Sequence, residues 1–365
     1  MNSSTSYIGK EHSIWIKGIL TILIVLGHNM IFTIPLREHG AMSFLYLFHI
    51  QVFFILPFLY GIDKQPYTKS RFKNTIIRFF WPYLLLVTLF AFSYNIATSY
   101  SQFSIQALLR LYVFCDSTTI RQMCGVQIFW FLPSMMCLVL LKELYYRNNL
   151  LVRCLLLFLS LTFIGLTIYS RTSYVAYSSW SNILQCIPLG GGYAVSLLVL
   201  GVVSRCIVAQ IVRHKWYLET ALICTICFAV CSGLYWSFVA KFMSSNPVNM
   251  LYVILQQIMP VIFLLILIAY FNLFKFKRSG YIERIGTYSL LIYLISPFIG
   301  YITTFIATRL HIMYWWVGLL IWPVIVFVSY QIARGFSNSD FVNILIPHNV
   351  DIFRQTFHKI KERYF

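Results

Sequence analysis

Long apolar segments recur along this chain, separated by short polar connections. A helix that crosses a bilayer needs about 20 mostly apolar residues, because each residue covers about 1.5 Å of a hydrocarbon layer about 30 Å thick. Segments of this length lie at 13–34, 41–60, 79–98, 127–146, 151–169, 184–204, 217–239, 251–273, 286–306 and 313–333. The sequence therefore predicts an all-α polytopic membrane protein with about ten transmembrane helices.

The composition agrees with this prediction. Only 10% of the residues are charged and 59% are hydrophobic, whereas soluble domains carry about 25% charged residues. Pro57 interrupts the apolar segment 41–60, and Pro297 interrupts the segment 286–306. Each of these two is expected either to cross the membrane or to be re-entrant.

The distribution of basic residues predicts the orientation. With the N-terminus in the cytoplasm, 22 of the 28 Lys and Arg residues fall in inner segments and 6 in outer ones, as the positive-inside rule requires. We therefore expect both termini in the cytoplasm, a single transmembrane domain at 1–334 and a basic cytoplasmic tail at 335–365. No small-residue cleavage site follows the first apolar segment, which is expected to remain as a crossing.

The chain carries a net charge of +18, and most of its basic residues are spread over six inner segments. A duplex requires a continuous basic surface, so this spread favours anionic membrane lipid as the partner and disfavours nucleic acid.

The cysteines give little indication of chemistry. Cys224, Cys227 and Cys231 share one face of an apolar helix, where packing is favoured over metal binding, and we predict no metal. Cys115 and Cys124 fall in the longest predicted outer loop, 99–126. Both a disulfide and two free thiols remain open for this pair.

Two histidines, His28 and His49, lie inside predicted crossings, whereas no Asp or Glu lies in the middle of one. Ion-coupled transport usually needs such carboxylates, so that class is disfavoured. Lys17 precedes His28 by about three helical turns, on the same face and about 16 Å away. This geometry suits a ligand with an anionic head in the cytosol and a reactive end near an imidazole that exchanges protons. A histidine that only packs against a neighbouring helix is the alternative.

A basic cluster precedes the third predicted crossing. Arg71, Asn74 and Arg78 share one helical face at the inner edge of the membrane. They are interpreted either as a phosphate clamp or as ordinary positive-inside anchors.

Several segments together resemble the acyltransferase-3 family of integral membrane proteins that O-acylate sugars and polysaccharides. They are the Lys17 to Gly27-His28 stretch, Phe48-His49 followed by Phe53-Phe54, the basic run 71–78 before Pro82, Phe129-Trp130-Phe131-Leu132, and 285–294 with Gly286, Ser289 and Tyr293. They occur in the family's order over nearly the whole chain. The chain differs in having Lys17 in place of the usual Arg, a basic cluster without the intact Arg-x-x-Arg pair, and Ser296 where many relatives have histidine.

The resemblance implies a multi-pass protein of the cytoplasmic (inner) membrane that uses acetyl-CoA, or a related acyl-CoA, as acyl donor. It implies His28 as the catalytic residue and Lys17, Arg71, Lys73 and Arg78 as the residues that bind the donor. It places His49, Trp130, Tyr288 and Tyr293 along the substrate channel.

We accordingly predict an O-acyltransferase, an acetyltransferase by family frequency, that acts on a hydroxyl of a cell-surface glycan or its lipid-linked precursor. Direct transfer and a ping-pong route both remain open, as does transfer to a separate extracytoplasmic partner. An exporter of polysaccharide or lipid-linked sugar is the main alternative, and a non-catalytic membrane scaffold is a second. The outer aromatics Tyr174, Tyr177 and Trp180 are expected to anchor the protein at the interface or, alternatively, to stack on sugars.

Overall fold

The computed structural model describes residues 7–36, 41–60, 69–98, 104–126, 128–172, 187–242, 246–274, 280–347, 353–358 and 362. Within these residues every regular element is a helix, and eight helices are long and apolar enough to cross a membrane. The prediction of an all-α polytopic membrane protein is therefore confirmed. Tyr174, Tyr177 and Trp180 lie outside the described residues.

The eight long helices coincide with eight of the ten predicted segments. They are α5 (Lys69–Thr98), α8 (Phe131–Arg147), α9 (Leu150–Thr172), α11 (Gly191–His214), α12 (Tyr217–Leu234), α14 (Asn246–Phe274), α16 (Ser289–Arg309) and α17 (Trp315–Ser337). Pro297 lies inside α16 without interrupting it. The segment that was expected either to cross or to re-enter thus contains a continuous helix of crossing length.

The two remaining predicted segments are interrupted helices. The first contains α1 (Lys10–His28) and α2 (Met30–Thr33), which are separated by one extended residue, Asn29. The second contains α3 (Ala41–Leu45), a turn at 46–48, α4 (His49–Ile55) and the 3-10 helix η1 (Leu56–Leu59). Interruptions at membrane depth are tolerated where the freed backbone groups are buried in protein.

The predicted outer loop 99–126 is largely helical. It contains α6 (Ile105–Leu109), the π-helical turn η2 (Arg110–Phe114) and α7 (Ser117–Cys124). Asp116 caps α7 by accepting hydrogen bonds from the backbone N–H groups of Thr118 and Thr119, and Gly125 ends it with a φ of 72°. A search for apolar segments of crossing length does not find these helices, because each is too short to span a membrane.

The shorter described elements connect these helices. They are η3 (Ile128–Trp130), η5 (Pro188–Gly190), η6 (Tyr235–Val239), α13 (Ala240–Phe242), α15 (Gly280–Thr287) and α18 (Asp340–Leu345).

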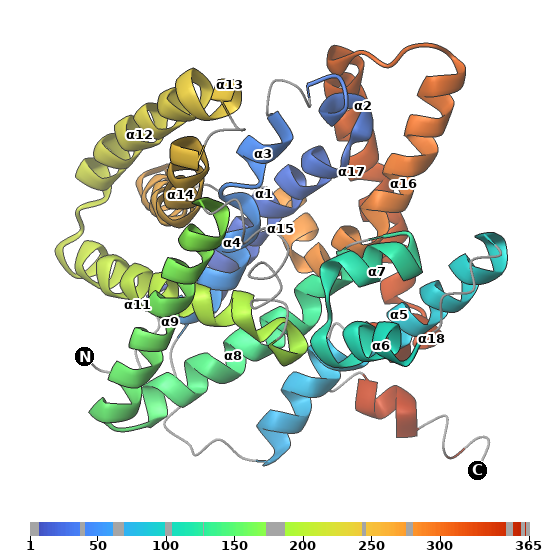
Figure 1. Cartoon of the computed structure of the whole chain (residues 1–365), viewed down its shortest axis with the longest axis horizontal. Helices are drawn as coiled ribbons and strands as arrows, with labels where there is room; N and C mark the ends of the chain where they lie inside the picture. The colour runs from blue at the N-terminus through green and yellow to red at the C-terminus, as the bar shows by residue number, and fades with distance from the viewer. Residues whose placement is uncertain are drawn as a thin grey trace.

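Helix α1 occupies the centre of the bundle (Figure 1), where it contacts α4, α14, α15, α16 and α17. Its approach to α15 depends on glycine. A β-carbon at Gly286 would collide with the carbonyl oxygen of Ile14, and one at Gly18 would collide with Ile282. The absence of side chains at these positions lets the two backbones pack closely, which fixes the part of α1 that carries Lys17.

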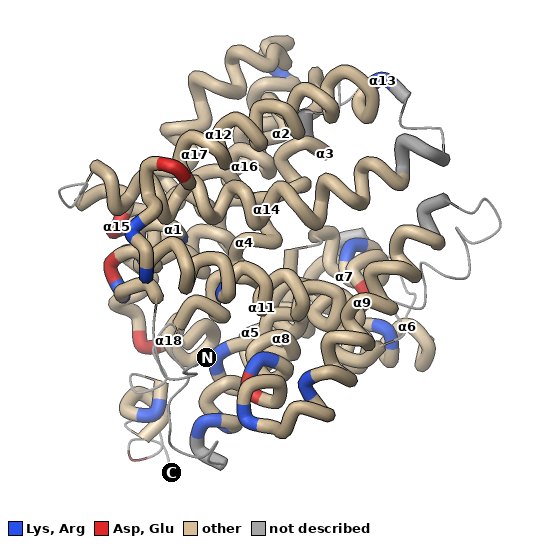
Figure 2. The backbone as a smooth tube through the Cα atoms, turned by 90° about the vertical axis from the view of Figure 1, so that its left-hand side faces the viewer, with Lys and Arg blue, Asp and Glu red and all other residues tan. Residues whose placement is uncertain are grey.

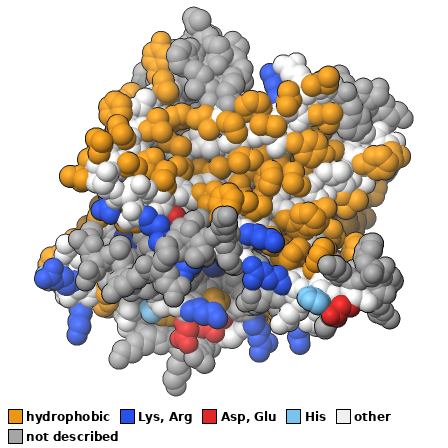
Figure 3. All heavy atoms as spheres, turned by 90° about the horizontal axis from the view of Figure 1, so that it is seen from below, with side chains coloured by type: hydrophobic (Ala, Val, Ile, Leu, Met, Phe, Trp, Pro, Cys, Tyr) orange, Lys and Arg blue, Asp and Glu red, His pale blue; other side chains and the backbone are white. Residues whose placement is uncertain are grey.

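The surface separates into an apolar band and a charged margin. Figure 3 shows hydrophobic side chains across the upper half of one face, with most of the Lys, Arg, Asp, Glu and His side chains in its lower half. Figure 2 shows many of the Lys and Arg residues at the end of the molecule where both chain termini lie. A lipid-facing belt beside a basic margin is typical of a multi-pass membrane protein.

Candidate functional site

The two intramembrane histidines both lie at helix interruptions. His28 is the last residue of α1, and His49 is the first residue of α4. The break after His28 is held by Asn29, whose Nδ2 donates a buried hydrogen bond of 2.7 Å to the carbonyl oxygen of Gly318 in α17. Both imidazoles are therefore placed by backbone geometry that a regular helix would not give.

His49 is fixed in a buried position, with 1% of its surface exposed. Its Nδ1 is hydrogen-bonded to the carbonyl oxygen of Leu45. Because a carbonyl only accepts, Nδ1 carries the proton and Nε2 is an acceptor in the neutral ring. A methyl group at Gly27 would lie 3.8 Å from Nε2, so the His49 ring packs against the residue that precedes His28.

His28 has an unused polar atom. Its Nδ1 is buried and has no hydrogen-bond partner among the described residues. The centroids of its ring and the Tyr293 ring are 6.0 Å apart. A β-carbon at Gly300 would lie 3.0 Å from the His28 carbonyl oxygen, so α16 packs tightly against this residue. Buried polar atoms are normally hydrogen-bonded, so this imidazole nitrogen retains unused hydrogen-bonding capacity.

A cavity of about 1190 Å³ opens beside α1. Its walls come from the start of α1, the end of η1, and α5, α8, α15 and α16. Among the described residues, four cationic side chains and no acidic ones line it; the four are Lys10, Lys17, Arg78 and Lys142. None of the four forms an ion pair with a described residue. Cations left unneutralised around one cavity attract an anionic ligand.

The end of the cavity that lies deepest in the bundle is apolar and leads toward His28. Ile24, Phe131 and Tyr293 line it there, and the ring centroids of Phe131 and Tyr293 are 5.2 Å apart. The Tyr293 hydroxyl donates a 2.8 Å hydrogen bond to the carbonyl oxygen of Ile128, which fixes the ring. His28 itself does not line the cavity; it lies against Tyr293, which does.

Lys17 and Arg78, which come from different helices, meet at this cavity. The Lys17 ammonium lies 6.0 Å from the centroid of the Tyr60 ring, and the Tyr60 hydroxyl is hydrogen-bonded to Ser13. Two of the predicted donor-binding residues are thus brought together.

The other two predicted donor-binding residues lie outside the cavity lining. Arg71 is half-buried and Lys73 is exposed, both near the start of α5. Asn74 does line the cavity, and its side-chain oxygen accepts a 2.7 Å hydrogen bond from Arg354 of the C-terminal segment.

Two predicted channel residues pack against other aromatic rings. Trp130 lies with its ring centroid 6.2 Å from that of Phe54 and 5.0 Å from that of Tyr193. Tyr288 packs against Tyr330, with centroids 6.0 Å apart. Neither residue lines the cavity, although Thr287 and Ser289 on either side of Tyr288 do.

The sequence did not single out two cations of the cavity, the exposed Lys10 and the buried Lys142; Lys142 is the more informative of the two. It lies on α8 with only 6% of its surface exposed. In the sequence it counts as one more basic residue near an inner helix end. The signal in the sequence was its distance from the end of α8, because Lys142 lies about 7.5 Å deeper along the helix axis than Arg147.

Arg205 is a second buried cation, and it supports the cavity wall. Its Nη1 donates hydrogen bonds of 2.5 Å and 2.7 Å to the carbonyl oxygens of Phe58 and Tyr60. Its guanidinium also lies over the rings of Tyr7 and Tyr146, at 4.9 Å and 5.2 Å. A buried charge held this way is a structural element, and here it positions Tyr60.

The cysteines are free in the described structure. Cys115 and Cys124 are both buried, and burial raises the pKa of each thiol to about 12. Their thiols donate to different carbonyl oxygens, those of Tyr112 and Val87. Cys224, Cys227 and Cys231 are also free, and the described His, Cys, Asp and Glu residues include no group suited to hold a metal ion.

No family model matches this chain, and no curated protein or solved structure matches it either. The site must therefore be interpreted from its own chemistry: a large cavity with cations at one end, an apolar deep end, and the His28 imidazole close to that deep end.

Proposed function

We propose that this protein is a membrane O-acyltransferase that moves an acetyl group from cytosolic acetyl-CoA to a hydroxyl of a cell-surface glycan or its lipid-linked precursor. The observation that carries the proposal is the cavity lined by Lys10, Lys17, Arg78 and Lys142, without an acidic side chain, that ends at Tyr293 beside His28.

The charges of the cavity match those of the donor. Coenzyme A carries several phosphate charges at one end and its thioester at the end of a long, largely neutral arm. Phosphates are bound by guanidinium and ammonium groups, and the cationic part of the cavity supplies both kinds. The neutral arm extends past Ile24 and Phe131 toward Tyr293.

In the proposed reaction, His28 acts as the general base. Its imidazole takes the proton from the acceptor hydroxyl as the hydroxyl oxygen attacks the thioester carbonyl carbon. The carbon–sulfur bond then breaks, and the imidazolium returns the proton to the leaving thiolate. The products are the acetyl ester and free coenzyme A, and His28 is neutral again. His49 positions α1 through its contact with Gly27.

The topology that we propose has ten crossings, with both termini on the cytoplasmic side of the inner membrane. In this topology α1 with α2 forms the first crossing, and α3, α4 and η1 form the second. Two features support it: the grouping of Lys and Arg near the termini (Figure 2), and the occurrence of both interruptions inside protein, where freed backbone groups can be satisfied.

Replacing His28 with Ala tests the catalytic role. Loss of a general base reduces the rate about 10²-fold to 10⁴-fold, so acetyl groups on the host's surface glycan should disappear while the protein stays in the membrane. His214→Ala is the matched control, because His214 is exposed at the end of α11. Unchanged acetylation in H28A would refute the catalytic role. Reduced glycan export with normal acetylation per sugar would instead support an exporter.

A further inference from the structure

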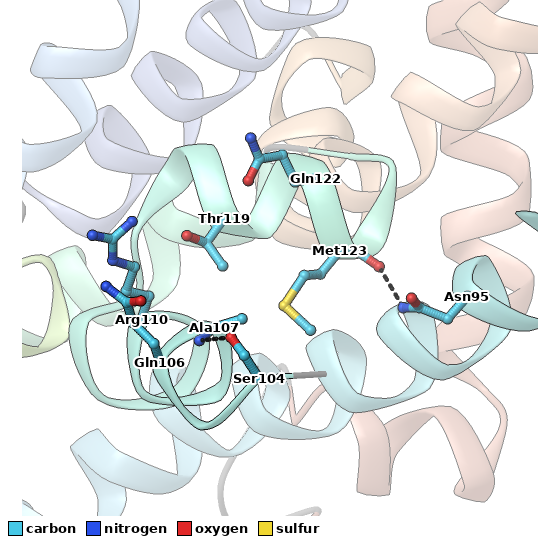
Figure 4. Close-up of a pocket in the computed structure, with 8 residues that line it drawn as sticks. All are labelled: Asn95, Ser104, Gln106, Ala107, Arg110, Thr119, Gln122 and Met123. Carbon is cyan, nitrogen blue, oxygen red and sulfur yellow. Dashed lines mark hydrogen bonds between the residues drawn. The ribbon is translucent and has the colours of Figure 1, made fainter. Parts of the chain in front are cut away.

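A second, smaller pocket lies between the end of α5 and the helical segment formed by α6, η2 and α7. Its volume is about 160 Å³. Its lining is mainly polar (Figure 4): Asn95, Ser104, Gln106, Arg110, Thr119 and Gln122.

This pocket and the cationic cavity lie near opposite ends of one membrane-length helix. Arg78 of α5 lines the cavity, and Asn95 of the same helix lines the pocket. Seventeen residues of helix separate them, which corresponds to about 26 Å, close to the thickness of the hydrocarbon layer. With the cavity at the cytoplasmic side, the pocket faces the extracytoplasmic side, where acyl-CoA is not found.

The walls of the pocket are firmly attached to α5. Asn95 Nδ2 donates to the carbonyl oxygen of Met123 at 3.3 Å (Figure 4), and Thr88 and Tyr112 are joined through their hydroxyls at 3.0 Å. The Tyr83 hydroxyl donates to the carbonyl oxygen of Leu111. These bonds connect α5 to α7 and to η2, so the helices that form the pocket are held together.

Some polar groups of the pocket do not use all of their hydrogen-bonding capacity. The Arg110 guanidinium makes no hydrogen bond or ion pair with a described residue. The carboxylate of nearby Asp116 is engaged with the backbone and hydroxyl of Thr119, and it does not line the pocket. The pocket therefore presents one cation among neutral amides and hydroxyls.

We propose that this pocket binds one sugar residue of the acceptor glycan, a residue that bears a carboxylate. Neutral amides and hydroxyls donate to and accept from sugar hydroxyls, and the planar guanidinium of Arg110 suits a carboxylate. A phosphate headgroup would be better matched by several cations, and this pocket has one. The identification of the bound sugar as part of the acceptor glycan rests on the proposed function. Binding of the sugar itself does not depend on catalysis.

The test measures binding of glucuronate, with glucose as the neutral probe, to the purified full-length protein in detergent by saturation-transfer NMR titration. We expect glucuronate to bind more tightly than glucose, and Arg110→Gln to weaken glucuronate binding at least about 10-fold. Arg121→Gln is the matched control, because Arg121 is an exposed arginine of α7 that does not line the pocket; it should bind as the unmodified protein does.

Three results would overturn the inference: no glucuronate binding, equal binding by R110Q and R121Q, or inorganic phosphate that binds more tightly than glucuronate and is lost in R110Q. The last would assign the pocket to a lipid headgroup. The H28A variant separates this inference from the proposed function, because it should bind glucuronate normally. If H28A retains acetylation but glucuronate binds through Arg110, the sugar site stands and the catalytic role fails.

Discussion

Helices α1 and α12 are similar in length and in apolar character, but α1 is largely buried and α12 is largely exposed. Both are apolar and close to 20 residues long, yet α1 buries Ile16 and Leu20 completely, whereas α12 leaves Ile223 and Ile226 about 60% and 63% exposed. Helix α12 is largely exposed on the outside of the bundle, whereas other helices surround α1. The difference explains why polar groups concentrate on α1, since a polar group inside a bundle can find partners that lipid does not offer.

The same comparison extends to glycine and to helix continuity. Gly18 lies in a tight backbone contact with Ile282, whereas a β-carbon at Gly233 of α12 would meet nothing within 4 Å. Helix α1 is broken at Asn29, whereas α12 runs without interruption from Tyr217 to Leu234. Helix α1 is thus constrained at several points, and these constraints position Lys17 and His28.

The largest stability effect should come from Gly286→Ala. The new methyl group would collide with the backbone of α1 at Ile14, and a backbone cannot move aside as a side chain can. We expect a loss of about 1–3 kcal/mol, together with loss of acyl transfer, measured by thermal unfolding in detergent and by an activity assay. Gly233→Ala is the control and should be neutral. Equal losses of stability in Gly286→Ala and Gly233→Ala would contradict the difference in packing between α1 and α12.

A smaller effect should follow from Asn29→Ala. The Gly318 carbonyl loses a buried hydrogen bond, which costs about 1–2 kcal/mol, and the break that ends α1 at His28 loses its anchor. Thr225→Ala on the exposed part of α12 should change stability by less than about 0.5 kcal/mol. An N29A protein with normal activity would mean that the helix break does not position His28.

The sequence predicts the helical class because length and apolarity alone determine which segments can cross a bilayer. It also predicts that Lys17 and His28 share a helix, because their spacing matches the helical repeat. The interruptions at Asn29 and at 46–48 could not be predicted, since they depend on partners distant in the chain, such as Gly318.

The residues that other helices contribute to the site could not be predicted from the sequence either. Lys142 reaches the cavity only because α8 packs beside α5, and helix neighbours are not encoded in the periodicity of any one segment. For the same reason the sequence could not show that Arg71 and Lys73 lie outside the cavity lining whereas Arg78 lies within it.

If the cationic cavity binds acetyl-CoA, equilibrium binding of acetyl-CoA to the purified protein will show it. We expect binding that weakens about 10-fold in Lys142→Gln, because one charge-assisted contact to phosphate is lost. Lys241→Gln, which changes an exposed lysine of α13, and His28→Ala should bind as the unmodified protein does. Absence of acetyl-CoA binding, or equal affinity in K142Q and K241Q, would show that the cavity is not the donor site.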